Sequence, residues 1–238
     1  MTAQISLGDI AVEVVFKDIK NIHLSVYPPD GKVRIAAPAR MSLERIRVFA
    51  VSKLRWIRQQ QEKFLSQERE TPRDYVDRES HSVWGKRYLL SIEACAQSPS
   101  VALEHNRMVL RVRAGADQAV NEAMLAQWYR EQLKAAATVL IAKWEPIIGV
   151  RVNRLFVQQM KTRWGSCNPR AGNIRLNTEL AKKPKECLEY IVVHELIHLL
   201  EPTHNGRFVG LMDQFLPQWS FYRQRLNRLP VRHADWSY

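Results

Sequence analysis

The stretch YIVVHELIHLLEPTHNGRF, from Tyr190 to Phe208, decides how the rest of the chain is interpreted. Its first half is apolar enough for a core helix, yet it carries two histidines and a glutamate. Burying imidazole and carboxylate groups among aliphatic side chains is costly unless a partner satisfies them. The nature of that partner is therefore the main clue to what this protein does.

The spacing of the polar residues predicts a site on one face of an α-helix. His194 and His198 are four residues apart, which places them one turn apart and within roughly 40° of each other. Aliphatic residues fill most other positions, so we expect the helix to be buried nearly all round, with its polar stripe facing an internal cleft. Either the histidines are satisfied core residues or they bind one cation, for which zinc is well suited.

Glu195 follows the first histidine and is expected to lie beside the metal without binding it. A bound zinc ion lowers the pKa of its water from 15.7 toward ~7, which makes hydroxide available at neutral pH. A free carboxylate next to that water can accept its proton and later deliver it to the leaving group. The pattern therefore predicts a zinc-dependent hydrolase, with one Zn²⁺ per chain and Glu195 as the general base.

A catalytic zinc ion needs a third protein ligand and an open fourth position. Pro202 turns the chain, so His204 can return toward the helix and is our first choice. The interval from His198 to His204 matches the HExxHxxGxxH pattern of metzincins, but Glu201 replaces the glycine of that pattern. Asp213, on the helix that follows, and Glu201 itself are the alternative ligands.

The bulk composition places the chain among ordinary globular proteins. Its 238 residues include no apolar run near the ~18 residues that cross a bilayer, and the N-terminus has no signal-peptide pattern. Three widely spaced cysteines do not suggest a disulfide framework, and Cys167 and Cys187 are expected to be buried thiols, not ligands. We expect a cytoplasmic bacterial protein without a transmembrane segment.

The net charge of +12 favours anionic partners such as nucleotides or nucleic acid. The basic residues are nevertheless spread along the chain, which also fits a solubilising surface. Nonspecific binding of nucleic acid through the basic surface is therefore an open alternative, although the sequence has neither an aromatic-interleaved RNA-binding motif nor a helix–turn–helix signature.

Two successive rounds of strands and helix precede the site. The first is HLSVYPPDGKVRIAAP, a strand–turn–strand, followed by a helix capped by Ser42 and by a linker-like SQERETPRD stretch. The second contains RYLLSIEA and NRMVLRVRAG, then a helix from about Asp117 to Lys143. Trp56 and Trp128 occupy similar places in the two helices, so a duplicated strand–strand–helix unit is one interpretation.

The remaining elements surround the histidine helix. VRVNRLFVQQM and NIRLNTEL are expected to form a hairpin with a long connection, KTRWGSCNPRAGN. NIRLNTEL could be an exposed edge that pairs with an extended peptide, or could merely complete the sheet. Asn205 is expected to cap a further helix, and a last helix carries Trp219.

TRWGSCNPRAGNIRLNTEL, followed by the histidine stretch, resembles the YgjP-like family of bacterial zinc metallopeptidases, which are often labelled SprT-like. The upstream GKVRIAAP and SKLRWIRQQ are also similar to that family, so the resemblance covers roughly Asn21 to Leu229. It implies His194, His198 and His204 as zinc ligands. Thr203 and Asn205 depart from the asparagine and serine that commonly flank the third histidine.

The resemblance implies an α+β fold with a zincin-like metallopeptidase core, in which a small antiparallel or mixed sheet accompanies the HExxH helix. We expect an N-terminal strand–strand–long-helix lobe over residues 1–75 and a zincin-like catalytic domain over residues 80–238.

The resemblance leaves the substrate open, because the family is linked both to peptide hydrolysis and to nucleotide pyrophosphate hydrolysis. A zinc metallopeptidase acting on a peptide or protein is our first hypothesis. A nucleoside-triphosphate pyrophosphate hydrolase and a nucleic-acid-associated SprT-like protease are the alternatives. Candidate substrate-binding residues are Arg163, whose guanidinium could approach a phosphate or carboxylate, Trp164 and Asn177.

Overall fold

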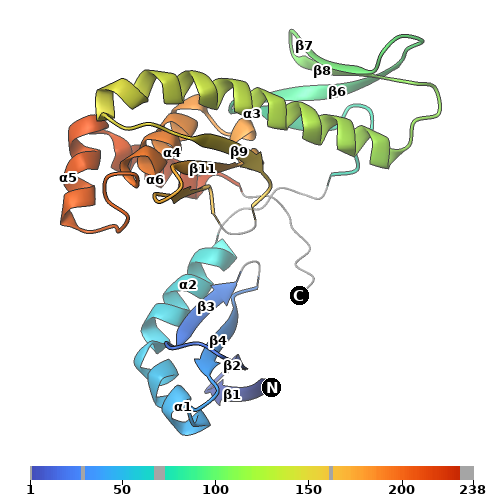
Figure 1. The fold of residues 1–238 in the computed structure, drawn as a ribbon. Coiled ribbons are helices and arrows are strands. Elements are labelled where there is room, and N and C mark those ends of the chain that lie inside the picture. Colours follow the sequence, from blue (N-terminus) through green and yellow to red (C-terminus); the bar gives the residue numbers. More distant parts are fainter. Residues whose placement is uncertain (1, 28–29, 67–72, 161–162, 231–238) are drawn as a thin grey trace. The chain divides into compact units, whose positions relative to one another are not determined.

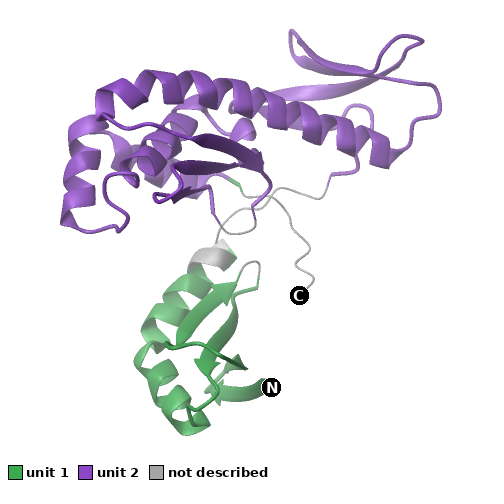
Figure 2. Cartoon of the chain, viewed as in Figure 1, with its two compact units in different colours: residues 1–72, 230–238 green, residues 73–229 purple. Residues whose placement is uncertain are grey.

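The computed structural model describes residues 2–27, 30–66, 73–160 and 163–230. The chain divides into two compact units (Figure 2). Unit 1 comprises residues 1–72 with 230–238, and unit 2 comprises residues 73–229. Most of the predicted linker SQERETPRD, and Pro28 and Pro29 of the predicted turn, lie outside the described residues.

Unit 1 is a four-stranded sheet with two helices (Figure 1). The strands are β1 (Thr2–Leu7), β2 (Ile10–Lys17), β3 (His23–Tyr27) and β4 (Lys32–Pro38), in the order β1-β2-β4-β3. The prediction of two strands was incomplete, because residues 2–17 form a further hairpin whose Ile5, Val12 and Val14 alternate into the core. The predicted single helix is two, α1 (Leu43–Ser52) and α2 (Leu54–Ser66), separated at Lys53.

Unit 2 begins with a second sheet of the same topology. Its strands are β5 (Ser80–Val83), β6 (Lys86–Ala94), β7 (Ser100–Glu104) and β8 (Arg107–Val112), in the order β5-β6-β8-β7. In both sheets the first two strands are antiparallel, the second and fourth are parallel, and the third and fourth are antiparallel. This shared topology agrees with the duplicated unit that the sequence suggested.

The helices that follow the two sheets also begin in the same way. Ser42 and Asp117 are N-caps, and each side chain accepts a hydrogen bond from the backbone N–H three residues later. The helix that Asp117 caps, α3 (Gln118–Ile148), is longer than predicted because it continues through Pro146. Trp144 and Ile148 lie on one buried face, which holds the last turn in the core, and Gly149 ends the helix with a φ of 78°.

A three-stranded sheet lies closest to the histidine helix. Its strands are β9 (Arg154–Gln158), β10 (Gly165–Asn168) and β11 (Asn173–Asn177), in the order β10-β11-β9. The predicted hairpin between β9 and β11 was wrong, because these two strands are parallel. The connection between them contains β10, which takes the antiparallel place beside β11. NIRLNTEL therefore completes the sheet, and its strand is central instead of forming an edge.

The histidine helix is α4 (Lys185–Ile197), which follows a 3-10 turn, η1 (Thr178–Lys182). Most of its residues are buried, as predicted, and α3 packs along it (Figure 1). Asn205 caps α5 (Gly206–Phe215) by accepting from the Phe208 N–H, and α6 (Trp219–Arg228) follows. Among the described helices, none combines the length and the apolar surface that a membrane crossing requires.

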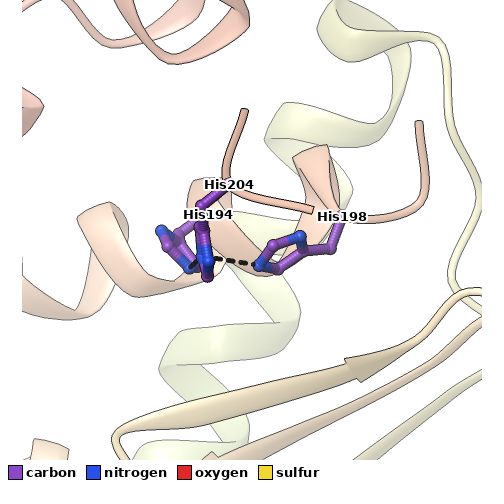
Figure 3. Close-up of side chains that lie close together, drawn as sticks. All are labelled: His194, His198 and His204. Carbon is purple, nitrogen blue, oxygen red and sulfur yellow. Dashed lines mark hydrogen bonds between the residues drawn. The ribbon is translucent and has the colours of Figure 1, made fainter. Parts of the chain in front are cut away.

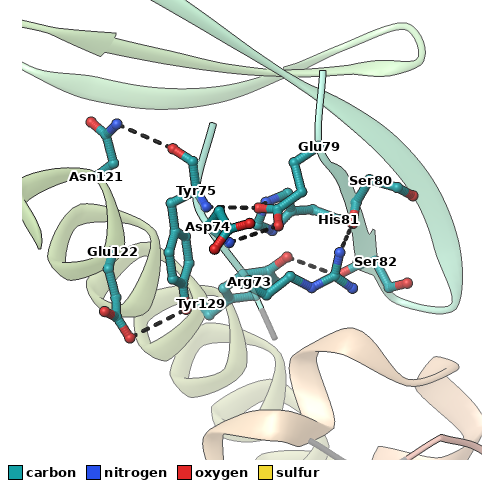
Figure 4. A network of polar contacts seen from close by, with 10 residues as sticks. All are labelled: Arg73, Asp74, Tyr75, Glu79, Ser80, His81, Ser82, Asn121, Glu122 and Tyr129. Atoms are coloured by element: carbon teal, nitrogen blue, oxygen red, sulfur yellow. Dashed lines mark hydrogen bonds and ion pairs between the residues drawn. The ribbon is translucent and has the colours of Figure 1, made fainter. Parts of the chain in front are cut away.

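A partly buried polar network joins the start of unit 2 to α3 (Figure 4). The Glu79 carboxylate accepts from the backbone N–H groups of Asp74 and Tyr75, and it contacts His81 Nε2 at 2.8 Å. The Asn121 amide donates to the Tyr75 carbonyl, and the Tyr129 hydroxyl donates to the Ser82 carbonyl. The network fixes the residues that lead into β5 against the long helix.

His81 makes this network sensitive to acid. Burial lowers the pKa of His81; Glu79 opposes that shift, whereas Arg73 and Lys182 add to it. Below about pH 6.5 the unfolded chain therefore binds a proton at His81 more readily than the folded chain does. The free energy of unfolding consequently decreases as the pH is lowered below this value. We expect urea denaturation to show a larger loss of stability from pH 7 to pH 5 in the wild type than in His81→Gln. Equal losses in the two proteins would contradict this assignment.

Candidate metal centre

His194 lies in the last turn of α4, and His198 follows as the C-cap residue. The ring centroids of His194 and His198 are 4.8 Å apart, as their four-residue spacing predicts. The helix proper ends at Ile197 and His198 is its C-cap, so the second imidazole stands where the helical hydrogen bonds give way to tighter turns. Both rings are largely shielded from solvent.

The chain then turns back and brings His204 to the same point. Two local hydrogen bonds shape the turn: the Thr203 hydroxyl donates to the Glu201 carboxylate, and the Asn205 amide donates to the Thr203 hydroxyl. His204 Nε2 lies 3.1 Å from His198 Nε2 and 3.0 Å from His194 Nε2. Figure 3 shows the three imidazoles turned toward one another.

The two alternative ligands are placed elsewhere. The Asp213 carboxylate accepts a hydrogen bond from the Trp219 indole at 2.7 Å. The Glu201 carboxylate is held by Thr203, while the Glu201 backbone carbonyl contacts His198 Nδ1 at 3.0 Å. Among the described residues, it is therefore His204 that the fold brings to the other two histidines.

The Nε2 atoms of the three histidines are better placed to bind a metal ion than to hydrogen-bond with one another. The contact of His198 Nδ1 with a carbonyl makes Nδ1 the protonated nitrogen, so Nε2 carries the lone pair. His204 Nε2 has at most one proton and cannot satisfy both neighbouring nitrogens by hydrogen bonding. In a tetrahedral zinc site with bonds of about 2.0–2.1 Å, ligand nitrogens are about 3.3–3.4 Å apart, close to the separations found here.

The surroundings favour the neutral form of His194 and His204. Burial lowers the pKa of His194 to about 3, and the neighbouring His198 and His204 add to the shift. Burial and the neighbouring His198 also lower the pKa of His204. Neutral imidazoles present the lone pairs that a cation requires, so little proton release needs to accompany metal binding at neutral pH.

Phe208 packs against all three imidazoles, and the sequence analysis did not assign this residue to the site. Its ring centroid lies 4.9 Å from that of His194 and 4.7 Å from those of His198 and His204. The side chain is buried, and the cap at Asn205 sets its position at the start of α5. Its spacing four residues after His204 is the signal that could have identified it.

Glu195 lies on the neighbouring face of α4 and is 4% exposed. Its Oε2 is buried without a hydrogen-bond partner among the described residues. Burial raises the pKa of Glu195 to about 8, and the positive charge of Arg163 opposes this shift. On its other side the carboxylate contacts the backbone of β10 at Gly165, where an added Cβ would lie 2.5 Å from Oε1.

The model of the YgjP-like, metallopeptidase domain family matches residues 20–229, most of the chain. The chain belongs to the YgjP-like family. Membership makes it a metallopeptidase at the family level and implies a metal ion, for which the three histidines are the candidate ligands. The comparison with curated proteins found no match to the sequence.

Two solved structures resemble part of this YgjP-like chain. One is the metallopeptidase zymogen of Pyrococcus abyssi abylysin, at 21% identity and a TM-score of 0.36, covering 38% of this chain and 90% of that one. The other is the metallopeptidase zymogen of Methanocaldococcus jannaschii jannalysin, at 18% identity and a TM-score of 0.35, covering 38% of this chain and 92% of that one.

The three candidate substrate-binding residues of the YgjP-like chain have different surroundings. Arg163 is exposed at the entry to β10, and Trp164 is half-buried against the core of unit 2. Asn177 is buried, and its amide donates to the backbone carbonyls of Met160 and Arg163, both at 2.9 Å. Its geometry favours holding the loop before β10 over touching a substrate.

The described cysteines are free, as the sequence predicted. Cys187 is buried on α4, and Cys167 is half-buried on β10. Burial raises the pKa of both thiols to about 11, and nearby Glu195 adds to the shift at Cys167. Neither sulfur belongs to the histidine cluster, and both favour the protonated form, which is a poor metal ligand.

Proposed function

We propose that this protein is a zinc-dependent metallopeptidase in which His194, His198 and His204 hold the ion and Glu195 is the general base. The observation that carries the proposal is the convergence of three histidine Nε2 atoms, with separations of 3.0 and 3.1 Å, beside a buried carboxylate. Membership of a metallopeptidase family supports the same assignment. Zinc is the preferred ion because imidazole ligands and an open fourth position are typical of catalytic zinc.

The chemistry divides between the ion and the protein. When bound, zinc would acidify a water molecule and polarise the carbonyl under attack. Glu195 takes the proton of the attacking water through its unpartnered Oε2 and passes it to the nitrogen of the leaving amine. Burial favours the protonated form of Glu195, whereas the charge of Arg163, and that of a bound cation, would favour the ionised carboxylate that a base requires. Phe208 limits rotation of the three imidazoles by packing against each ring.

The position of β10 suggests how a peptide would be held. β10 is an edge strand of its sheet in the described part of the chain, and its first residue contacts Glu195. An extended peptide can add a strand to such an edge through main-chain hydrogen bonds. This assignment moves the proposed peptide-binding edge from NIRLNTEL, which is central, to β10.

The proposal is tested by offering peptides and nucleotides to the same zinc-loaded protein. We expect cleavage of a mixed peptide library at internal amide bonds, with loss of activity on chelation and recovery on addition of zinc. Nucleoside triphosphates in a parallel reaction should remain intact. Pyrophosphate release without peptide cleavage would replace the proposal with the nucleotide alternative, for which the described residues provide no specific support.

A further inference from the structure

Gly165 touches the carboxylate of Glu195 more closely than any residue with a side chain could. A Cβ built on Gly165 would lie 2.5 Å from Glu195 Oε1, 2.9 Å from Cγ and 3.0 Å from Cδ. Several other glycines of the chain have positive φ, but this one does not, so close approach and not backbone conformation requires glycine here.

The backbone at Gly165 is held firmly on both sides. Gly165 pairs with Leu176 in the antiparallel ladder between β10 and β11, and Leu176 is fully buried. Just before it, the Trp164 carbonyl accepts from the Asn177 N–H at 2.9 Å, and the Arg163 carbonyl accepts from the Asn177 side chain at 2.9 Å. These contacts fix β10 to β11, so β10 cannot shift on its own without breaking them.

The glutamate has little freedom of its own. Glu195 is 4% exposed, and Val193 and Leu196 beside it on the helix are fully buried. A side chain at position 165 would meet not only the terminal oxygen but also Cγ and Cδ, so rotation of the carboxylate alone would not relieve the contact. The whole side chain would have to adopt another rotamer.

We propose that Gly165 is a positioning residue for the general base: the bare backbone of β10 fixes the rotamer of Glu195, and Asn177 fixes that backbone. The inference rests on the proposed function, since it assigns Glu195 the role of base. A displacement of about 1 Å in a reacting group can lower the rate by about 100-fold. Loss of the contact between Gly165 and Glu195 should therefore lower kcat much more than it lowers the affinity for zinc.

The first test compares Gly165→Ala with a matched control, Gly210→Ala, on peptide hydrolysis. Gly210 lies on α5, and a Cβ added there has nothing within 4 Å. We expect Gly165→Ala to lower kcat by about 100-fold, with KM and zinc affinity changed by less than about threefold, while Gly210→Ala retains wild-type kcat. An unchanged kcat in Gly165→Ala, or a loss explained by zinc release, would overturn the positioning role.

The second test does not depend on activity. Gly165→Ala is expected to lower the urea midpoint in the wild type, and to lower it much less when Glu195→Ala has removed the carboxylate. Additive losses would mean that position 165 clashes with something other than Glu195, and would overturn the inference even in an active peptidase. Coupled losses in a protein that cleaves no peptide would instead refute the proposed function and leave the contact established.

Discussion

Replacing Glu195 with glutamine is expected to lower kcat for peptide hydrolysis by about 10²- to 10⁴-fold while zinc binding is retained. Glutamine keeps nearly the same shape beside Gly165, so the fold and the histidine cluster should be unaffected. It cannot accept the proton of the attacking water, and a neutral amide replaces the carboxylate. Steady-state kinetics on a fluorogenic peptide and metal analysis of the same sample measure both quantities.

The matched control is Glu186→Gln on the same helix. Glu186 is exposed in the first turn of α4, so the same chemical change there should leave kcat within about twofold. Near-normal turnover by zinc-loaded Glu195→Gln would show that another group acts as base. Loss of zinc from that variant would show instead that Glu195 is a ligand, contrary to the arrangement of the three histidines.

Removing the third imidazole is the second change with a large expected effect. His204→Ala should weaken zinc binding by more than about 100-fold, because loss of a direct ligand exceeds the roughly 10- to 100-fold cost of losing a group that merely orients one. His204 is exposed and lies outside the helices, so the fold should tolerate the substitution. Competition with a chromophoric chelator measures the affinity.

Asp213→Asn tests the alternative ligand set. The Asp213 carboxylate is bonded to the Trp219 indole, and asparagine retains an oxygen that can accept that bond. We expect zinc affinity within about threefold of the wild type. A large loss in Asp213→Asn together with a small loss in His204→Ala would reverse the assignment.

The histidine helix could be predicted because the information is local. The four-residue interval between His194 and His198 fixes a common face on any α-helix, and the surrounding aliphatic residues require burial. The capping preference of Asn205 likewise predicted where α5 begins. Local spacing and capping thus accounted for the helices on either side of the histidine cluster.

The sheets and the rest of the site depend on contacts between distant segments. The sequence predicted a hairpin of β9 and β11 because no local signal marks Gly165–Asn168 as a strand. These four residues of the connection form β10, which pairs with β11 on the side opposite to β9. The closeness of Gly165 to Glu195 follows from how β10 lies against α4. Asn177 likewise acquires its role only when β11 brings its amide to the loop before β10.

The most direct test of the metal centre is zinc K-edge X-ray absorption of the loaded protein. The arrangement of His194, His198 and His204 predicts three imidazole ligands and one oxygen at about 2.0–2.1 Å, and no sulfur at about 2.3 Å. His204→Ala, loaded with excess zinc, should lose one imidazole from this set. A sulfur ligand, or a wild-type spectrum with fewer than three imidazoles, would contradict the account.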